Sequence, residues 1–172
     1  MFLQIRTGEM GRIIFIASAL ITGNSQVLSA ENYSLGNLQI SNIWARATPG
    51  RARTAAVYIE RIHNSGGQID SLIYMSSPLA RKNLIHKTIV EDGIAKMSYV
   101  KVLKIHAGRS VSLKPGGLHI MMFGVQKSLK RGFKFPMILE FQKAGKIEVV
   151  VEVKNIGSSP LMKMDHKKKH QH

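Results

Sequence analysis

The sequence predicts an all-β sandwich, and three observations support this fold class. Short apolar runs recur along the chain, groups of Gly, Pro, Asn, Asp or Ser residues separate them, and no segment shows the 3.6-residue period of an amphipathic helix. Many short strands with frequent turns are typical of a sandwich. A chain of 172 residues is long enough for one such domain with additional terminal segments.

Turn residues divide the first half of the chain into four predicted strands. Pro fixes φ, and Gly, Asn and Asp accept turn conformations, so clusters of these residues mark strand ends. The clusters are Thr48-Pro49-Gly50, Asn64-Ser65-Gly66-Gly67, Ser76-Ser77-Pro78 and Glu91-Asp92-Gly93. The strands that they bound are 38–47, 54–63, 69–75 and 84–90. Residues 31–37 are expected to be a short lead-in, and residues 79–83 fit either a helical turn or a loop.

The second half of the chain is divided in the same way into five predicted strands. Pro115-Gly116 has the chemistry of a type II turn, from which a strand is expected to leave. Residues 143–145 separate the last two strands, which are expected to pair. The last strand alternates apolar residues such as Ile147 and Val149 with charged ones such as Glu148. The five strands are 95–103, 110–113, 118–125, 137–142 and 146–153.

The N-terminus resembles an export signal. Arg6 and Arg12 form a positively charged region before the apolar run 13–21, and residues 28–30 form a small-residue cleavage site. A membrane anchor is the alternative, but the run is shorter than the ~20 residues that a spanning helix needs. We therefore expect a signal peptide at 1–30, a β-sandwich domain at 31–157, a flexible tail at 158–172 and a periplasmic location.

Cysteine is absent and the charge is strongly positive. Without Cys there can be no disulfide framework, thiolate ligand or thiolate nucleophile. The net charge is +15, and residues 1–30 contain two Arg and one Glu, so the remainder keeps +14. Such a charge suits peripheral contact with an anionic membrane or an acidic partner, and a basic surface that serves solubility is an equal alternative. Nucleic acid is not expected as a partner, because the Lys and Arg residues are scattered and Trp44 is the only tryptophan.

Four spaced residues form a candidate metal site: His86, Met97, His119 and Met121. Two imidazoles and two thioethers are soft, uncharged donors that favour Cu(I) over zinc, magnesium or calcium. His119 and Met121, two apart in a strand, face the same side, and Met97 follows the turn after the strand of His86. Taken singly, a Met is usually core and a His usually a surface residue, so the prediction depends on the combination.

A second group of donors crowds the C-terminal tail. Met162, Met164, His166, His170 and His172 are interleaved with lysines, and His-rich tracts suggest metal binding. A second, weaker copper site that takes Cu(II) is one interpretation. A solvated cationic tail is an equal alternative, and an expression tag is a lesser one.

The spacing His-x10-Met-x21-His-x-Met resembles the signature of the periplasmic copper chaperones known as PCu(A)C. The segments 44–49, 54–58, 77–78, 84–86, 91–93 and 114–121 continue the resemblance in order. It implies a cupredoxin-like Greek-key β-sandwich that binds one Cu(I) through these four donors. It also implies delivery of copper to an acceptor, foremost the binuclear centre of cytochrome c oxidase or its assembly factor. Ile94 and His106 depart from the family pattern, where many relatives have Met and Pro.

A non-enzymatic copper chaperone is therefore the leading prediction. A passive copper buffer for tolerance is the alternative that the sequence does not separate from it. An electron carrier normally needs a Cys thiolate, and this chain has none. A surface-binding module driven by charge alone would ignore the four donors. Because imidazoles must be neutral to bind, copper affinity is expected to fall below about pH 6.5.

Overall fold

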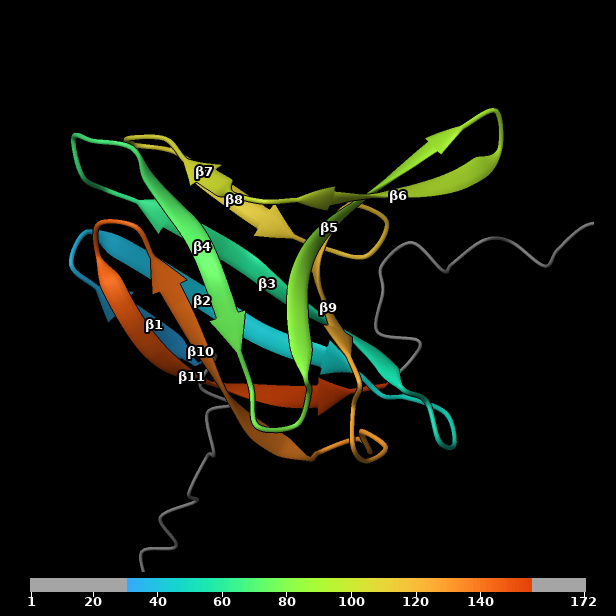
Figure 1. Cartoon of the computed structure of the whole chain (residues 1–172). Coiled ribbons are helices and arrows are strands. Elements are labelled where there is room, and N and C mark those ends of the chain that lie inside the picture. The colour runs from blue at the N-terminus through green and yellow to red at the C-terminus, as the bar shows by residue number, and fades with distance from the viewer. Residues whose placement is uncertain (1–30, 156–172) are drawn as a thin grey trace, which may run out of the picture.

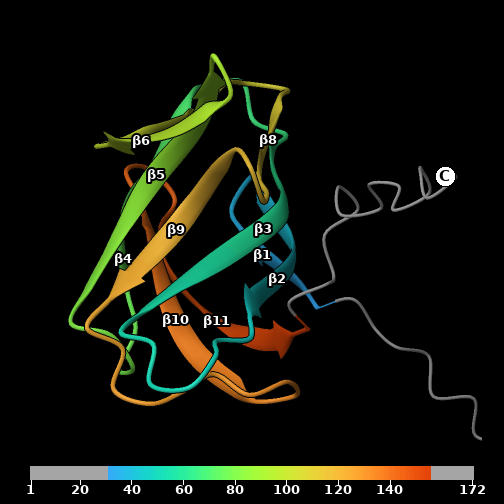
Figure 2. The same cartoon turned by 90° about the vertical axis from the view of Figure 1, so that its right-hand side faces the viewer.

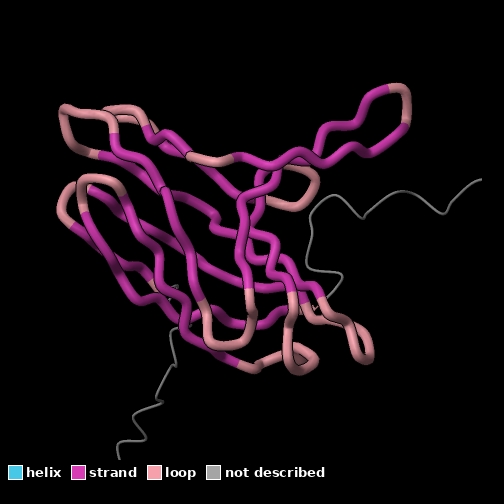
Figure 3. Tube along the Cα trace, in the orientation of Figure 1, coloured by secondary structure: helices cyan, strands magenta, loops and turns pink. Residues whose placement is uncertain are grey.

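The computed structural model describes residues 31–155, which form eleven β-strands joined by loops (Figure 1, Figure 3). The strands are β1 (Asn32–Leu35), β2 (Leu38–Arg46), β3 (Thr54–Asn64), β4 (Asp70–Ser76), β5 (Lys82–Glu91), β6 (Ile94–Val100), β7 (Leu103–Ile105), β8 (Ser110–Leu113), β9 (Leu118–Phe123), β10 (Lys134–Phe141) and β11 (Gly145–Lys154). Within this part of the chain no helix is long and apolar enough to cross a membrane. The all-β prediction is confirmed. The predicted signal peptide and the tail from residue 158 onward lie outside the described residues.

The strands form one sheet that folds over on itself. Its order is β6-β5-β9-β3-β2-β11-β10-β4-β7, with β1 paired to β2 and β8 paired to β3. β11 and β2 run parallel, whereas β2 and β3 and the hairpins are antiparallel. In Figure 2 the layer with β5, β9 and β3 lies over the layer with β10 and β11. The result is a sandwich.

The core lies between these two layers. Side chains alternate along the strands, so every second residue is buried in β10 and, from Val149 onward, in β11. Val57, Ile85, Ile120 and Met122 point inward from the opposite layer and are at most 2% exposed. Burying each such side chain contributes roughly 1.5–3 kcal/mol. The core thus holds the fold without disulfides.

All nine predicted strands occur, with three differences. Residues 32–35, expected to be a lead-in, form β1 and pair with β2 across the turn Gly36–Asn37. The predicted strand 95–103 is two strands, because β6 pairs with β5 and β7 pairs with β4. β10 begins at Lys134, before Pro136, and pairs with β4 only from Ile138 onward. Pro136 has no N–H to donate, and it lies where the β4 side of β10 is unpaired, so no hydrogen bond of the sheet is lost there. Residues 79–81, left open, form turns and a bend rather than a helix.

The β5–β6 hairpin projects from the body of the sandwich (Figure 1). Asp92 and Gly93 join the two strands with φ of 52° and 76°, as a two-residue type I′ turn requires. β6 is the edge strand, and its residues 94–99 are all exposed. The hairpin thus has an unpaired edge next to β5, which carries His86.

Candidate metal site

The alternation of β9 separates the candidate ligands from the core. Ile120 and Met122 are fully buried on the inner face, so His119 and Met121 lie on the outer one. His86 is directly opposite His119 in the register of β5 and β9. The inner face of β5 there carries the buried Ile85. The predicted ligands therefore face away from the core.

The two histidines form a close pair. Their ring centroids are 6.1 Å apart, with 65° between the ring planes. With a metal–nitrogen bond of about 2.0 Å, and a ring centroid roughly 1 Å behind its nitrogen, two imidazoles on one ion have centroids at most about 6 Å apart. The observed separation is therefore near the upper limit for both rings binding one ion.

His119 is held in one orientation. It is only 6% exposed, and its Nδ1–H donates a hydrogen bond to the Gly117 carbonyl, 3.0 Å away. The turn that places Gly117 is closed by its own N–H bond to the Lys114 carbonyl. Since Nδ1 carries the proton, the lone pair of Nε2 is free for a ligand. Hydrogen bonds of this kind orient metal-binding histidines.

His86 lacks such a partner. Its Nδ1 is buried and has no hydrogen-bond partner among the described residues. Burial lowers the pKa of His86 below its ordinary value, and the neighbouring His119 lowers it further. A buried nitrogen without a partner, on a ring kept neutral, is suited to bind a metal ion.

The two thioethers occupy diagonal positions about His86. Met121 is opposite Leu84 and next to the direct pair formed by His86 and His119. Met97 is opposite Thr88 on β6, also diagonal to His86. Side chains so placed start about 7–8 Å apart, a gap that the long, flexible Met side chain can reduce. Met121 is half-buried, whereas Met97 is 60% exposed. The strand pairing therefore brings the histidines together, and Met97 lies further out on the hairpin.

Aromatic rings, which the sequence-based prediction of the site does not include, surround the histidines. Phe123 and Tyr99 lie 5.7 Å and 6.5 Å from the His86 ring, and Tyr58 lies 6.3 Å from the His119 ring. Trp44 packs against Tyr58 at 4.6 Å. Tyr99 and Phe123 are two residues beyond Met97 and Met121, so strand alternation was a signal for them. They make the site apolar, with no carboxylate beside the imidazoles in the register.

Three other methionines of the described residues do not join this group. Met75, Met122 and Met137 are at most 5% exposed and belong to the core. The predicted tail donors, from Met162 to His172, lie outside the described residues. Among residues 31–155, no three His, Cys, Asp or Glu side chains are close enough to hold a metal ion.

The fold and this face define a cupredoxin-like β-sandwich that presents imidazoles and thioethers on its outer surface. The family described as putative lipoprotein LpqE-like matches residues 38–153. The chain therefore belongs to the LpqE-like family.

Known proteins are similar to the chain in sequence and in fold. The putative lipoprotein Lxx21020 of Leifsonia xyli subsp. xyli is 29% identical over 161 residues, which cover 90% of this chain and 95% of that protein. The copper-bound PCuAC domain from PmoF2 superposes with a TM-score of 0.63 at 24% identity, over 73% of this chain and 98% of that domain. The solution structure of CuI-DR1885 from Deinococcus radiodurans gives a TM-score of 0.54 at 28% identity, over 65% and 74% of the two chains. The resemblance to PCu(A)C proteins and the cupredoxin-like fold are confirmed.

Proposed function

We propose that the chain is a copper chaperone that binds one Cu(I) through His86, Met97, His119 and Met121. The observation that carries this proposal is the register of β5 and β9, which sets two imidazoles opposite each other on the outer face. Both thioethers occupy neighbouring positions on that face. Neutral nitrogen and sulfur donors favour Cu(I) because they place no negative charge on the ion.

The surroundings of the site support carriage rather than catalysis. Of the proposed ligands, His119 is 6% exposed, whereas Met97 is 60% exposed. Met97 is therefore the ligand that an incoming donor can displace most easily, which gives copper a route out by ligand exchange. A thiolate on the acceptor binds Cu(I) better than a thioether does and would drive this exchange. We therefore propose that the chain carries copper and is not an enzyme.

Two structural relatives support copper as the cargo. The PmoF2 domain was solved in a copper-bound form, and the DR1885 protein was solved with Cu(I). We further propose that the chain acts in the periplasm and that its acceptor is the binuclear copper centre of cytochrome c oxidase or its assembly factor. These finer proposals follow the resemblance to PCu(A)C chaperones.

Binding is tested by titrating Cu(I) anaerobically, against a competing chelator, into the full chain and into the Met97→Ala/His119→Ala variant. Trp44 is the only tryptophan, and Tyr58 separates it from His119, so its fluorescence provides a second readout. We expect one tightly bound ion that the variant loses. Equal affinity in the two proteins would refute the four-donor site.

A copper-transfer assay distinguishes a chaperone from a copper buffer. The loaded chain is mixed with the copper-free soluble domain of the oxidase subunit, and copper is measured on each after separation. A chaperone should lose its copper faster than free exchange through the chelator allows. Transfer no faster than that exchange would leave buffering as the function.

A further inference from the structure

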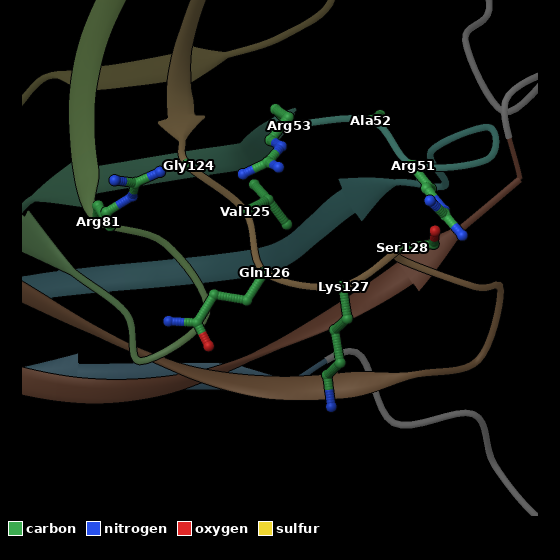
Figure 4. A pocket seen from close by; sticks show the side chains of 9 residues that line it. All are labelled: Arg51, Ala52, Arg53, Arg81, Gly124, Val125, Gln126, Lys127 and Ser128. Atoms are coloured by element: carbon green, nitrogen blue, oxygen red, sulfur yellow. The ribbon is translucent and has the colours of Figure 1, made fainter.

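A cavity of about 500 Å³ lies at the opposite end of β9 from His119, beyond Phe123. Three loops line it: the one before β3, the one before β5 and the one after β9. Figure 4 shows the guanidinium groups of Arg53 and Arg81 turned toward each other beside Gly124. We propose that this Arg53–Arg81 pocket binds the phosphate group of an anionic phospholipid head group.

Backbone hydrogen bonds fix the loops that carry the two arginines. The Arg81 N–H donates to the Phe123 carbonyl, and the Val125 N–H donates to the Arg53 carbonyl, each at 3.0 Å. Gly124 has a φ of +66°, and a Cβ added there would lie 2.7 Å from Arg81 Nε. The Arg81 side chain therefore lies directly against the backbone of Gly124. Loops ordered in advance lose less conformational entropy on binding a ligand.

The charge of the pocket has no counterpart among the described residues. Four of its nine lining residues are Arg or Lys and none is acidic. None of the salt bridges within residues 31–155 involves these four cations. An anion would compensate this charge, and the planar guanidinium forms paired hydrogen bonds to phosphate oxygens.

The surrounding loops favour a membrane surface over a protein partner. The segments 47–53, 77–83 and 124–133 contain seven Lys and Arg and no Asp or Glu. A rim of a single sign suits an anionic bilayer, whose charge is also of one sign. The cavity is large enough for a head group, since ligand pockets typically span about 300–1,000 Å³. Free phosphate has the same chemistry and is the other source to be tested.

The experiment uses the copper-free full chain and two charge-matched double variants. Arg53→Gln/Arg81→Gln removes the pocket, and Arg61→Gln/Arg109→Gln removes two exposed arginines elsewhere. Arg53→Lys/Arg81→Lys keeps the charge and removes the guanidinium fork. Thermal unfolding first establishes that each variant is folded. Vesicles of phosphatidylcholine, with and without phosphatidylglycerol, are then sedimented with each protein at fixed ionic strength. Inorganic phosphate is titrated while the amide NMR signals of Gly124 and Val125 are followed.

Phosphatidylglycerol vesicles should bind the chain, and Arg53→Gln/Arg81→Gln should weaken binding about tenfold or more, since charge-assisted hydrogen bonds are lost. The lysine variant should fall in between, and the control should change less than about threefold. Amide shifts with phosphate but no vesicle binding would support the anion site with free phosphate as its source. Equal weakening in the two glutamine variants would show diffuse attraction and overturn the proposal. Polyglutamate is the probe for an acidic protein partner. Binding to polyglutamate, without amide shifts on adding phosphate, would also overturn the proposal in favour of such a partner.

Discussion

Adjacent methionines on β9 allow copper binding and stability to be separated. Met121 lies on the outer face beside His119, and Met122 is fully buried on the inner face. Leucine has nearly the same volume as methionine but no sulfur, so it preserves packing and removes a donor. We therefore compare Met121→Leu with Met122→Leu.

The two substitutions should have opposite profiles. Loss of an outer-shell partner already costs about 10–100-fold in metal affinity, so loss of a donor should cost roughly 100-fold, or about 2.7 kcal/mol. Met121 is only half-buried, and its replacement should change the free energy of unfolding by less than about 1 kcal/mol. Met122→Leu should cost up to about 1.5 kcal/mol of stability, a decrease of several degrees in Tm, with no change in copper affinity.

The assay is anaerobic Cu(I) competition, together with thermal unfolding of each copper-free variant. Met97→Leu provides an independent test of the second thioether. Because Met97 is 60% exposed, the Tm of this variant should hardly change. If Met121→Leu binds Cu(I) as tightly as the unchanged chain, Met121 is not a ligand. If Met122→Leu loses as much copper affinity as Met121→Leu, the loss comes from the fold, and the division of β9 into two functional faces is wrong.

Three further predictions concern the histidine pair, the core edge and the tail. Burial and the neighbouring His119 lower the pKa of His86 in the folded chain. His86 therefore contributes its full stabilisation above the unfolded pKa near 6.5, and this contribution is lost as pH falls through the lower folded pKa. An NMR titration of His86 should find a midpoint below 6.5. Asp70→Ala removes the carboxylate that accepts hydrogen bonds from three backbone N–H groups, those of residues 71, 143 and 144. The free energy of unfolding, measured in urea, should fall by about 2–4 kcal/mol. A fall below about 1 kcal/mol would mean that water replaces the carboxylate as acceptor. Deleting 161–172 should remove a second, weaker Cu(II) equivalent and leave the Cu(I) site intact; unchanged stoichiometry would dispose of the tail site.

Turn chemistry accounts for most of the correct fold prediction. Asp92-Gly93 and Pro115-Gly116 mark turns by their backbone preferences alone, so the strands beside them could be located. Gly36-Asn37 is a similar two-residue turn signal between alternating residues, and it indicates the β1–β2 hairpin in place of the lead-in expected at 31–37. The break between β6 and β7 had no local signal. It occurs where the chain changes its partner from β5 to β4, and that pairing depends on the whole fold.

The candidate site, like the fold, was predictable only where it depends on local sequence. The period of two placed His119 and Met121 on one face, and the turn at residues 91–93 placed Met97 near the strand of His86. The direct pairing of His86 with His119 could not be read locally, because 32 residues separate them and the register depends on the core side chains of β5 and β9. The exposure of Met97 was equally unpredictable, since it results from β6 being an edge strand.

Under the proposed function, the two faces of β9 would let one short strand serve both stability and cargo exchange. Its inner residues contribute to the core, so the fold does not depend on the metal. Its outer residues can therefore bind copper with an affinity set by donor chemistry and exposure rather than by the cost of folding. In the proposed site His119, held by Gly117, would be the fixed ligand, and Met97, on the projecting edge strand, would be the replaceable one. A site built from ligands of unequal fixation favours stepwise release to an acceptor that approaches from the side of the β5–β6 hairpin.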